Sequence, residues 1–124
     1  ESYFRGLERK IIAGLSKRRD AVIDAGGGAV IDESNVKGLK ANGVIFCLNA
    51  APEIILRRTE KYTHRPLLNV PDPLAEIKKL LKKRKNYYKK ADYQIDTSAK
   101  SVDEVSREII KKWNTGAKED RNQK

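Results

Sequence analysis

Apolar residues recur at helical spacing over residues 2–17, which predicts an amphipathic helix. The residues on its apolar face are Phe4, Leu7, Ile11, Ile12 and Leu15. Two short apolar runs follow, at residues 21–25 and at residues 44–48, and the first of them ends in three consecutive glycines. Runs of this kind are typical of strands in a parallel sheet, where both faces are buried. Residues 2–48 therefore predict an alternation of helix and strand.

The same alternation continues to residue 113. We expect helices at residues 32–41, 52–59, 74–90 and 101–113, and a strand at residues 93–95. Asn42 and Gly43 predict a helix cap, Pro52 suits the first position of a helix, and Ser101 with Glu104 forms a capping box. Alternating strands and helices predict an α/β fold, with a parallel sheet covered by helices on both faces.

Two segments fall outside this pattern. Residues 60–73 have no periodicity and contain three prolines, which predicts a loop of functional length. Residues 116–124 are polar and follow Gly116, which predicts a disordered tail. We therefore expect one domain over residues 1–115 and a tail over residues 116–124.

Composition narrows the class of protein. The hydrophobic content of 39% fits a small globular domain, and no apolar run approaches the roughly 20 residues of a membrane span. The single cysteine, Cys47, lies in an apolar run and is expected to be a small buried hydrophobic residue. We predict a cytoplasmic monomer. The chain begins at Glu1 within a helical pattern and has no methionine, which suggests that an N-terminal part is missing.

The net charge of +10 favours an anionic partner, either small substrates or nucleic acid. Most lysines fall on predicted exposed helix faces, which is typical of solubility. A basic nucleic-acid-binding module is one alternative, but the arginines are scattered and no known binding motif is present. Nucleic acid is therefore the less favoured partner.

Gly26, Gly27 and Gly28 are the most informative residues. Three glycines cost much backbone entropy on folding, so a folded chain keeps them where its backbone passes close to something. A flexible surface turn is the alternative interpretation. Arg5 precedes them with Glu8 one helical turn later, a spacing that predicts an ion pair. Arginine binds carboxylates through two parallel hydrogen bonds, which lysine cannot do.

Five segments, in this order, resemble the shikimate kinases, which phosphorylate shikimate with ATP. They are residues 1–8, residues 26–30, residues 57–59, residues 65–68, and Arg84 followed by Tyr88, Ala91 and Asp92. The resemblance extends from Glu1 to about Trp113. It implies an α/β fold of the P-loop kinase type, a three-layer parallel sheet from which the central phosphate-loop strand is absent in this chain.

The resemblance also implies roles for particular residues. Arg5 and Arg84 would bind the carboxylate of shikimate, and Gly26, Gly27 and Gly28 would offer close backbone approach to it. On the nucleotide side, Arg58 would pack against adenine, and Arg65 would act catalytically from a lid that closes over the phosphates. The resemblance assigns no metal ligand within the chain. His64 is interpreted as an exposed loop residue, and Tyr88 as a packing residue.

Two departures from the family stand out. Asp24 and Ala25 replace the small neutral or hydroxyl residues that usually precede the glycines, and a buried carboxylate there would need a partner. No segment matches the Gly-x-x-Gly-x-Gly-Lys-Ser/Thr phosphate loop or the Asp-x-Asp segment. The resemblance places the main ATP and Mg²⁺ ligands there, so we expect the chain alone to be inactive. A kinase for a related metabolite and a non-catalytic shikimate-binding protein remain alternatives.

Overall fold

The structure, a computed structural model, describes residues 2–60 and 70–122, the last six of them by their backbone alone. The chain forms two compact units, one of Glu1–Ile45 with Arg84–Asp92 and the other of Phe46–Lys83 with Tyr93–Lys124. The predicted division into a domain of residues 1–115 and a tail stays a prediction.

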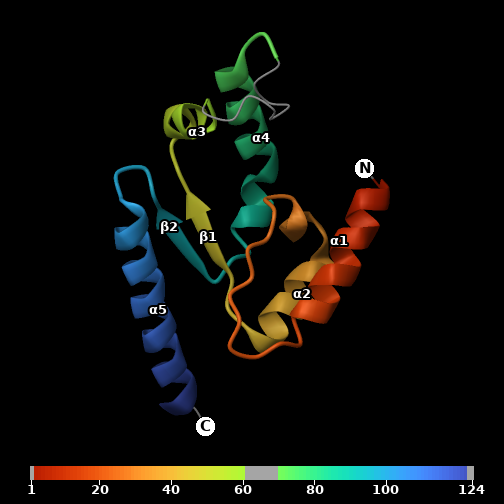
Figure 1. The fold of residues 1–124 in the computed structure, drawn as a ribbon, viewed down its shortest axis with the longest axis vertical. Helices are drawn as coiled ribbons and strands as arrows, with labels where there is room; N and C mark the ends of the chain where they lie inside the picture. Colours follow the sequence, from red (N-terminus) through yellow and green to blue (C-terminus); the bar gives the residue numbers. More distant parts are fainter. Residues whose placement is uncertain (1, 61–69, 123–124) are drawn as a thin grey trace. The chain divides into compact units, whose positions relative to one another are not determined.

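Helices form most of the first unit. Helix α1 (Ser2–Leu15) packs against the short 3-10 helix η1 (Ala29–Ile31) and against α2 (Glu33–Asn42), as Figure 1 shows. The buried apolar residues of this unit are Ile12, Ala29 and Val36. Helix α1 has the predicted amphipathic character, yet Phe4, Leu7 and Ile11 remain 57%, 41% and 59% exposed. The apolar face of α1 is therefore only partly covered in the structure.

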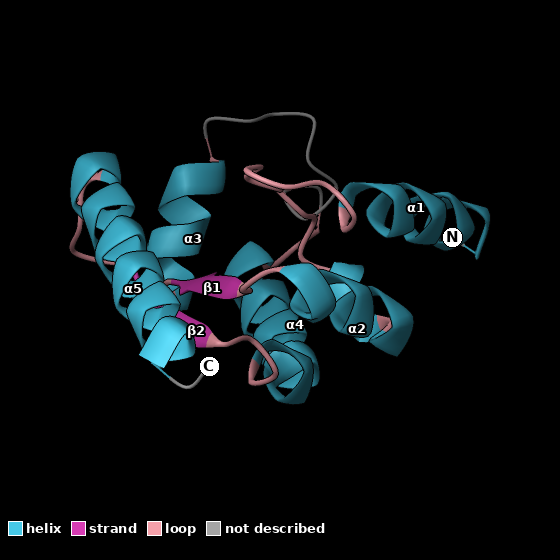
Figure 2. Ribbon diagram, turned by 90° about the horizontal axis from the view of Figure 1, so that it is seen from below, coloured by secondary structure: helices cyan, strands magenta, loops and turns pink. Residues whose placement is uncertain are grey.

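The strand predicted at residues 21–25 is not formed, which corrects the sequence analysis. Figure 2 shows loop between α1 and η1, and Val22 is fully exposed. An extended segment gains strand hydrogen bonds only from a neighbouring strand. In the described part of the chain the sheet has two strands, and neither pairs with residues 21–25.

The second unit contains this parallel sheet. Strands β1 (Phe46–Asn49) and β2 (Tyr93–Asp96) pair with Phe46 opposite Tyr93 and Leu48 opposite Ile95. The rings of Phe46 and Tyr93 stack with centroids 5.2 Å apart, and Ile95 is 1% exposed. Because β1 has one neighbour, Leu48 remains 53% exposed, so the predicted burial of β1 on both faces is wrong.

The second unit also contains the helices α3 (Pro52–Thr59) and α5 (Val102–Asn122) and most of α4 (Pro73–Tyr88). The last turns of α4 belong to the first unit. The predicted starts of α3 and α5 are confirmed: Pro52 is the first residue of α3, and Ser101 and Glu104 form the capping box before α5. Cys47 is half-buried and donates to Asn49 Oδ1 at 3.2 Å, and burial raises the pKa of its thiol.

One predicted helix end needs correction, and another is confirmed. Helix α5 continues to Asn122, past the end expected near Trp113, because Gly116 has no positive φ and one internal glycine costs only about 1 kcal/mol. A Cβ at Gly116 would lie 3.0 Å from Tyr93 Oη, so the glycine makes room for Tyr93. Gly43 follows α2 in an extended conformation with φ −161°, and there a Cβ would lie 3.1 Å from Leu39 O. Gly43 is the C-cap residue of α2, which confirms the cap predicted at Asn42 and Gly43.

Candidate functional site

The three glycines form a turn that leads into η1. The amide of Ala29 donates to Gly26 O at 3.0 Å, and the amide of Ile31 donates to Gly28 O at 3.2 Å. Gly28 has φ −88° and ψ −6°, and no described glycine has a positive φ. None of the three glycines therefore needs a left-handed backbone, and close neighbours are the reason for glycine at positions 27 and 28.

Space is restricted at Gly27 and Gly28. A Cβ at Gly28 would collide with the guanidinium of Arg5, with Arg5 Cζ at 2.7 Å. At Gly27 a Cβ would lie 2.9 Å from Tyr88 Oη and 3.3 Å from Arg84 Nη1. At Gly26 it would lie 3.7 Å from Glu8 Oε2, an ordinary contact. The turn thus brings four side chains together: those of Arg5, Glu8, Arg84 and Tyr88.

The predicted ion pair on α1 is confirmed. Arg5 Nη1 donates to Glu8 Oε1 at 2.9 Å, and the two side chains are 27% and 14% exposed. The guanidinium also lies 5.5 Å from the centre of the Phe4 ring. Partial burial strengthens a charge pair relative to one in open solvent. Glu8 therefore fixes one edge of the Arg5 guanidinium beside Gly28.

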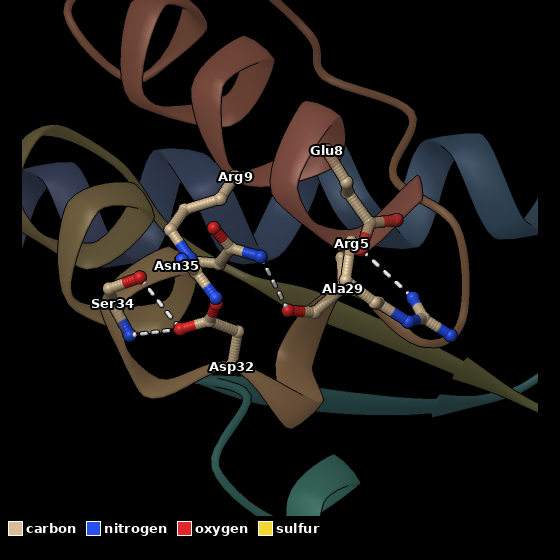
Figure 3. A network of polar contacts seen from close by, with 7 residues as sticks. All are labelled: Arg5, Glu8, Arg9, Ala29, Asp32, Ser34 and Asn35. Atoms are coloured by element: carbon tan, nitrogen blue, oxygen red, sulfur yellow. Dashed lines mark hydrogen bonds and ion pairs between the residues drawn. The ribbon is translucent and has the colours of Figure 1, made fainter. Parts of the chain in front are cut away.

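A second polar network, which the sequence analysis missed, fixes α1 to the start of α2 (Figure 3). Asp32 caps α2 by accepting from the amide of Ser34 at 2.9 Å and from its hydroxyl at 2.6 Å, and Arg9 Nε donates to it at 2.6 Å. These hydrogen bonds, those from Ser34 first, lower the pKa of Asp32 to about 2. The Asp-x-Ser pattern at a helix start is the sequence signal for this cap.

Asn35 completes this network from inside the unit. It is 2% exposed, and its Nδ2 donates to Ala29 O at 3.0 Å (Figure 3). That carbonyl belongs to the residue directly after the glycine turn. The network therefore holds the turn against α1, which carries Arg5.

Arg84 and Tyr88 come from the last turns of α4, in the part of that helix that belongs to the first unit. They lie one helical turn apart, and Arg84 Nη1 donates to Tyr88 Oη over a long 3.4 Å. Both side chains are half-buried. The first unit therefore contains all of the residues that the resemblance places around the carboxylate of shikimate.

Arg58 lies in the second unit, at the carboxyl ends of the two strands. Its Nη1 donates to Thr97 Oγ1 at 2.9 Å and its Nη2 to Thr97 O at 2.7 Å. Thr97 is 7% exposed, and its amide donates to Asn49 O at 2.7 Å. Hydrogen bonds from Ser98 lower the pKa of the neighbouring Asp96. Ligands of α/β proteins commonly bind at this edge of a sheet.

Other predicted features are located as follows. Arg65 and His64 lie outside the described residues. Asp24 is exposed, so a buried carboxylate does not arise there. Residues 2–60 and 70–122 contain no group of three or more His, Cys, Asp or Glu side chains that could hold a metal ion. Within the same residues, no helix has the length and apolar character needed to cross a membrane.

Solved structures of known proteins are similar to this chain. A solved structure of shikimate kinase from Acinetobacter baumannii in complex with shikimate matches with a TM-score of 0.84 and 31% identity, covering 94% of this chain and 65% of that one. A crystal structure of the shikimate kinase from Aquifex aeolicus matches with a TM-score of 0.76 and 34% identity, covering 94% and 68%. These neighbours define an α/β protein of the P-loop kinase fold.

Sequence comparisons are more specific. The family model described as shikimate kinase matches residues 1–114. The shikimate kinase of Caldanaerobacter subterraneus subsp. tengcongensis is 45% identical over 113 residues, which are 91% of this chain and 66% of that enzyme. The chain belongs to the shikimate kinase family. It spans about two thirds of the length of curated relatives such as this one.

Proposed function

We propose that this chain binds shikimate and serves in its ATP-dependent phosphorylation to shikimate 3-phosphate. The observation that carries the proposal is the glycine turn, which holds Arg5 beside Gly28 and Arg84 beside Gly27 within one compact unit. Shikimate has one carboxylate, and guanidinium groups are suited to bind it through paired hydrogen bonds. In this proposal Arg5 and Arg84 bind the carboxylate, Glu8 orients Arg5, and Gly26, Gly27 and Gly28 approach the ligand.

The nucleotide side of the proposal rests on Arg58 and Arg65. Two hydrogen bonds to Thr97 hold the Arg58 guanidinium at the carboxyl end of the sheet, an arrangement that fits stacking on adenine. Arg65, outside the described residues, would meet the transferring phosphate from the lid and act in catalysis. Bound Mg²⁺ would supply charge neutralisation to that transfer.

The phosphate and metal ligands are proposed to come from polypeptide outside this sequence. The printed sequence has no Gly-x-x-Gly-x-Gly-Lys-Ser/Thr segment, and phosphoryl transfer depends on such a cradle for positioning. Phe4, Leu7 and Ile11 also line an apolar groove on α1 beside Ile23, a surface that further polypeptide could cover. We therefore propose that the chain alone is inactive, and otherwise a cytoplasmic monomer.

A chimera tests the proposal directly. In it, this chain replaces the matching two thirds of the Caldanaerobacter shikimate kinase, so that the remaining third of that enzyme supplies the phosphate loop. We expect shikimate-dependent ADP release from the chimera and none from the 124-residue chain. Shikimate binding without turnover would instead support a non-catalytic shikimate-binding protein. If neither protein bound shikimate, the proposal would be overturned.

A further inference from the structure

We propose that the hydroxyl group of Tyr88 is a positioning group for Arg84, and that Gly27 is glycine because it must leave room for this hydroxyl. The inference rests on the proposed function, since it deepens the role of Arg84 in binding shikimate. It assigns to Tyr88 a task beyond packing. Tyr88 acts through Arg84 and is a positioning residue.

The geometry at Gly27 carries the first step. A Cβ at this position would lie 2.9 Å from Tyr88 Oη, closer than real Cβ atoms approach an oxygen, and 3.3 Å from Arg84 Nη1. The backbone of Gly27 and the ends of both side chains therefore meet at one point. Because no described glycine has a positive φ, alanine at position 27 would meet no backbone strain, but its Cβ would have to displace the ends of these two side chains.

The second step concerns the freedom of the arginine. An arginine side chain has many rotamers, and ordering it on ligand binding lowers affinity. Arg84 Nη1 donates to Tyr88 Oη at 3.4 Å from one helical turn away, and the Gly27 backbone lies beside both groups. The hydroxyl thus limits where the guanidinium can lie before shikimate arrives. Its loss should weaken shikimate binding and leave the chemical step almost unchanged.

The matched variants are Tyr88→Phe and Tyr87→Phe, which remove one hydroxyl each from neighbouring positions of α4. We expect Tyr88→Phe to raise the shikimate Kd roughly three- to tenfold, as for one modest hydrogen bond. In the chimera, the KM for shikimate should rise by a similar factor while kcat and the KM for ATP stay unchanged. Tyr87→Phe should leave all of these values unchanged.

Two double variants separate positioning from general loosening of the fold. In an Arg84→Ala background, Tyr88→Phe should have no further effect on the shikimate Kd, because the group that it positions is gone. Gly27→Ala alone should weaken binding by pushing against the hydroxyl. Adding Tyr88→Phe to Gly27→Ala should then recover part of the lost affinity, a partial rescue that a merely structural tyrosine would not produce; the tight contact with Arg84 Nη1 at 3.3 Å remains.

The measurement is calorimetric titration of shikimate into the 124-residue chain and, in parallel, into the chimera. A Tyr88→Phe variant that binds shikimate as tightly as the unchanged protein would overturn this inference alone. Equal losses in Tyr88→Phe and Tyr87→Phe, or no rescue of Gly27→Ala, would overturn it as well. Absence of shikimate binding in both unchanged proteins would instead overturn the proposed function, and this inference with it.

Discussion

The guanidinium group of Arg5 lies where the side chain of any residue larger than glycine at position 28 would begin. Arg5 belongs to α1, whereas Gly28 directly precedes η1. Glycine at position 28 therefore makes room for Arg5, because it allows α1 and the turn to approach until the guanidinium lies over the backbone. This contact explains the glycine at position 28 by the space that Arg5 occupies, and the explanation does not depend on backbone flexibility.

Gly28→Ala is expected to displace the Arg5 guanidinium and to weaken shikimate binding by about tenfold or more. Gly14→Ala is the matched control, because a Cβ at Gly14 of α1 meets nothing within 4 Å. That control should stabilise α1 by up to about 1 kcal/mol and leave affinity unchanged. Calorimetric titration and thermal unfolding measure the two effects. Unchanged affinity in Gly28→Ala would contradict the contact.

Arg84→Ala is expected to remove most shikimate affinity, on the order of 100-fold, because a charge-assisted partner of the carboxylate is lost. Lys85→Ala, which removes a charge from an exposed neighbour on α4, controls for the change in net charge. Calorimetric titration into the chimera gives both values. An equal effect in the two variants would show that Arg84 contributes only to the general electrostatic potential.

Asp32 predicts a pH dependence of stability. Its pKa in the folded protein is lowered from the ordinary 3.8 to about 2, mainly by hydrogen bonds from Ser34 and then from Arg9. A carboxyl group with a lowered pKa stabilises the fold above its unfolded pKa, and this stabilisation is lost as the pH falls through the folded pKa. The unchanged protein should thus be more stable than the Asp32→Asn variant by a full margin above about pH 4, and this margin should vanish towards about pH 2.

Thermal unfolding of both proteins over that pH range tests the direction of this pH dependence. Asparagine is also a good helix N-cap, so the comparison isolates the charge of Asp32. Asp24→Asn, which changes an exposed aspartate of the same unit, is the matched control and should not alter the pH dependence. An advantage of the unchanged protein that grows as the pH falls would contradict the account.

Arg65→Ala should lower the turnover of the chimera more than it weakens shikimate binding, because the proposed partner of Arg65 is the transferring phosphate. His64→Ala, at the adjacent position, should affect turnover much less. Steady-state kinetics and equilibrium titration give the two quantities separately. Equal losses of turnover and affinity in Arg65→Ala would assign this arginine to the acceptor site.

Local patterns in the sequence predicted the helices and the Arg5–Glu8 pair well, because caps, helical spacing and i,i+3 contacts are encoded within a few residues. Contacts between segments that are far apart in the sequence were harder to predict. The sequence predicted a strand at residues 21–25 that is not formed, and it did not indicate that Arg9 would reach Asp32. It singled out the glycines, but their neighbours in space, Tyr88 above all, became visible only in three dimensions.

Thr97→Val is expected to raise the KM for ATP of the chimera about three- to tenfold and to leave the KM for shikimate unchanged. Thr97 Oγ1 accepts from Arg58 Nη1 at 2.9 Å and donates to Asn49 O at 2.9 Å, so valine removes both bonds while it keeps the shape. The carbonyl of Thr97 would still accept a hydrogen bond from Arg58 Nη2, which limits the rise in the KM for ATP. The guanidinium would then rotate more freely and stack less well on adenine.

Thr59→Val is the matched control, because the hydroxyl of Thr59 bonds to carbonyls within its own helix α3. It should change neither KM. A Thr97→Val enzyme with an unchanged KM for ATP would show that Arg58 is held well enough by the carbonyl of Thr97 alone, or that Arg58 does not contact the nucleotide. Arg58→Ala decides between these two outcomes, since only an arginine that stacks on adenine would raise the KM for ATP when it is removed.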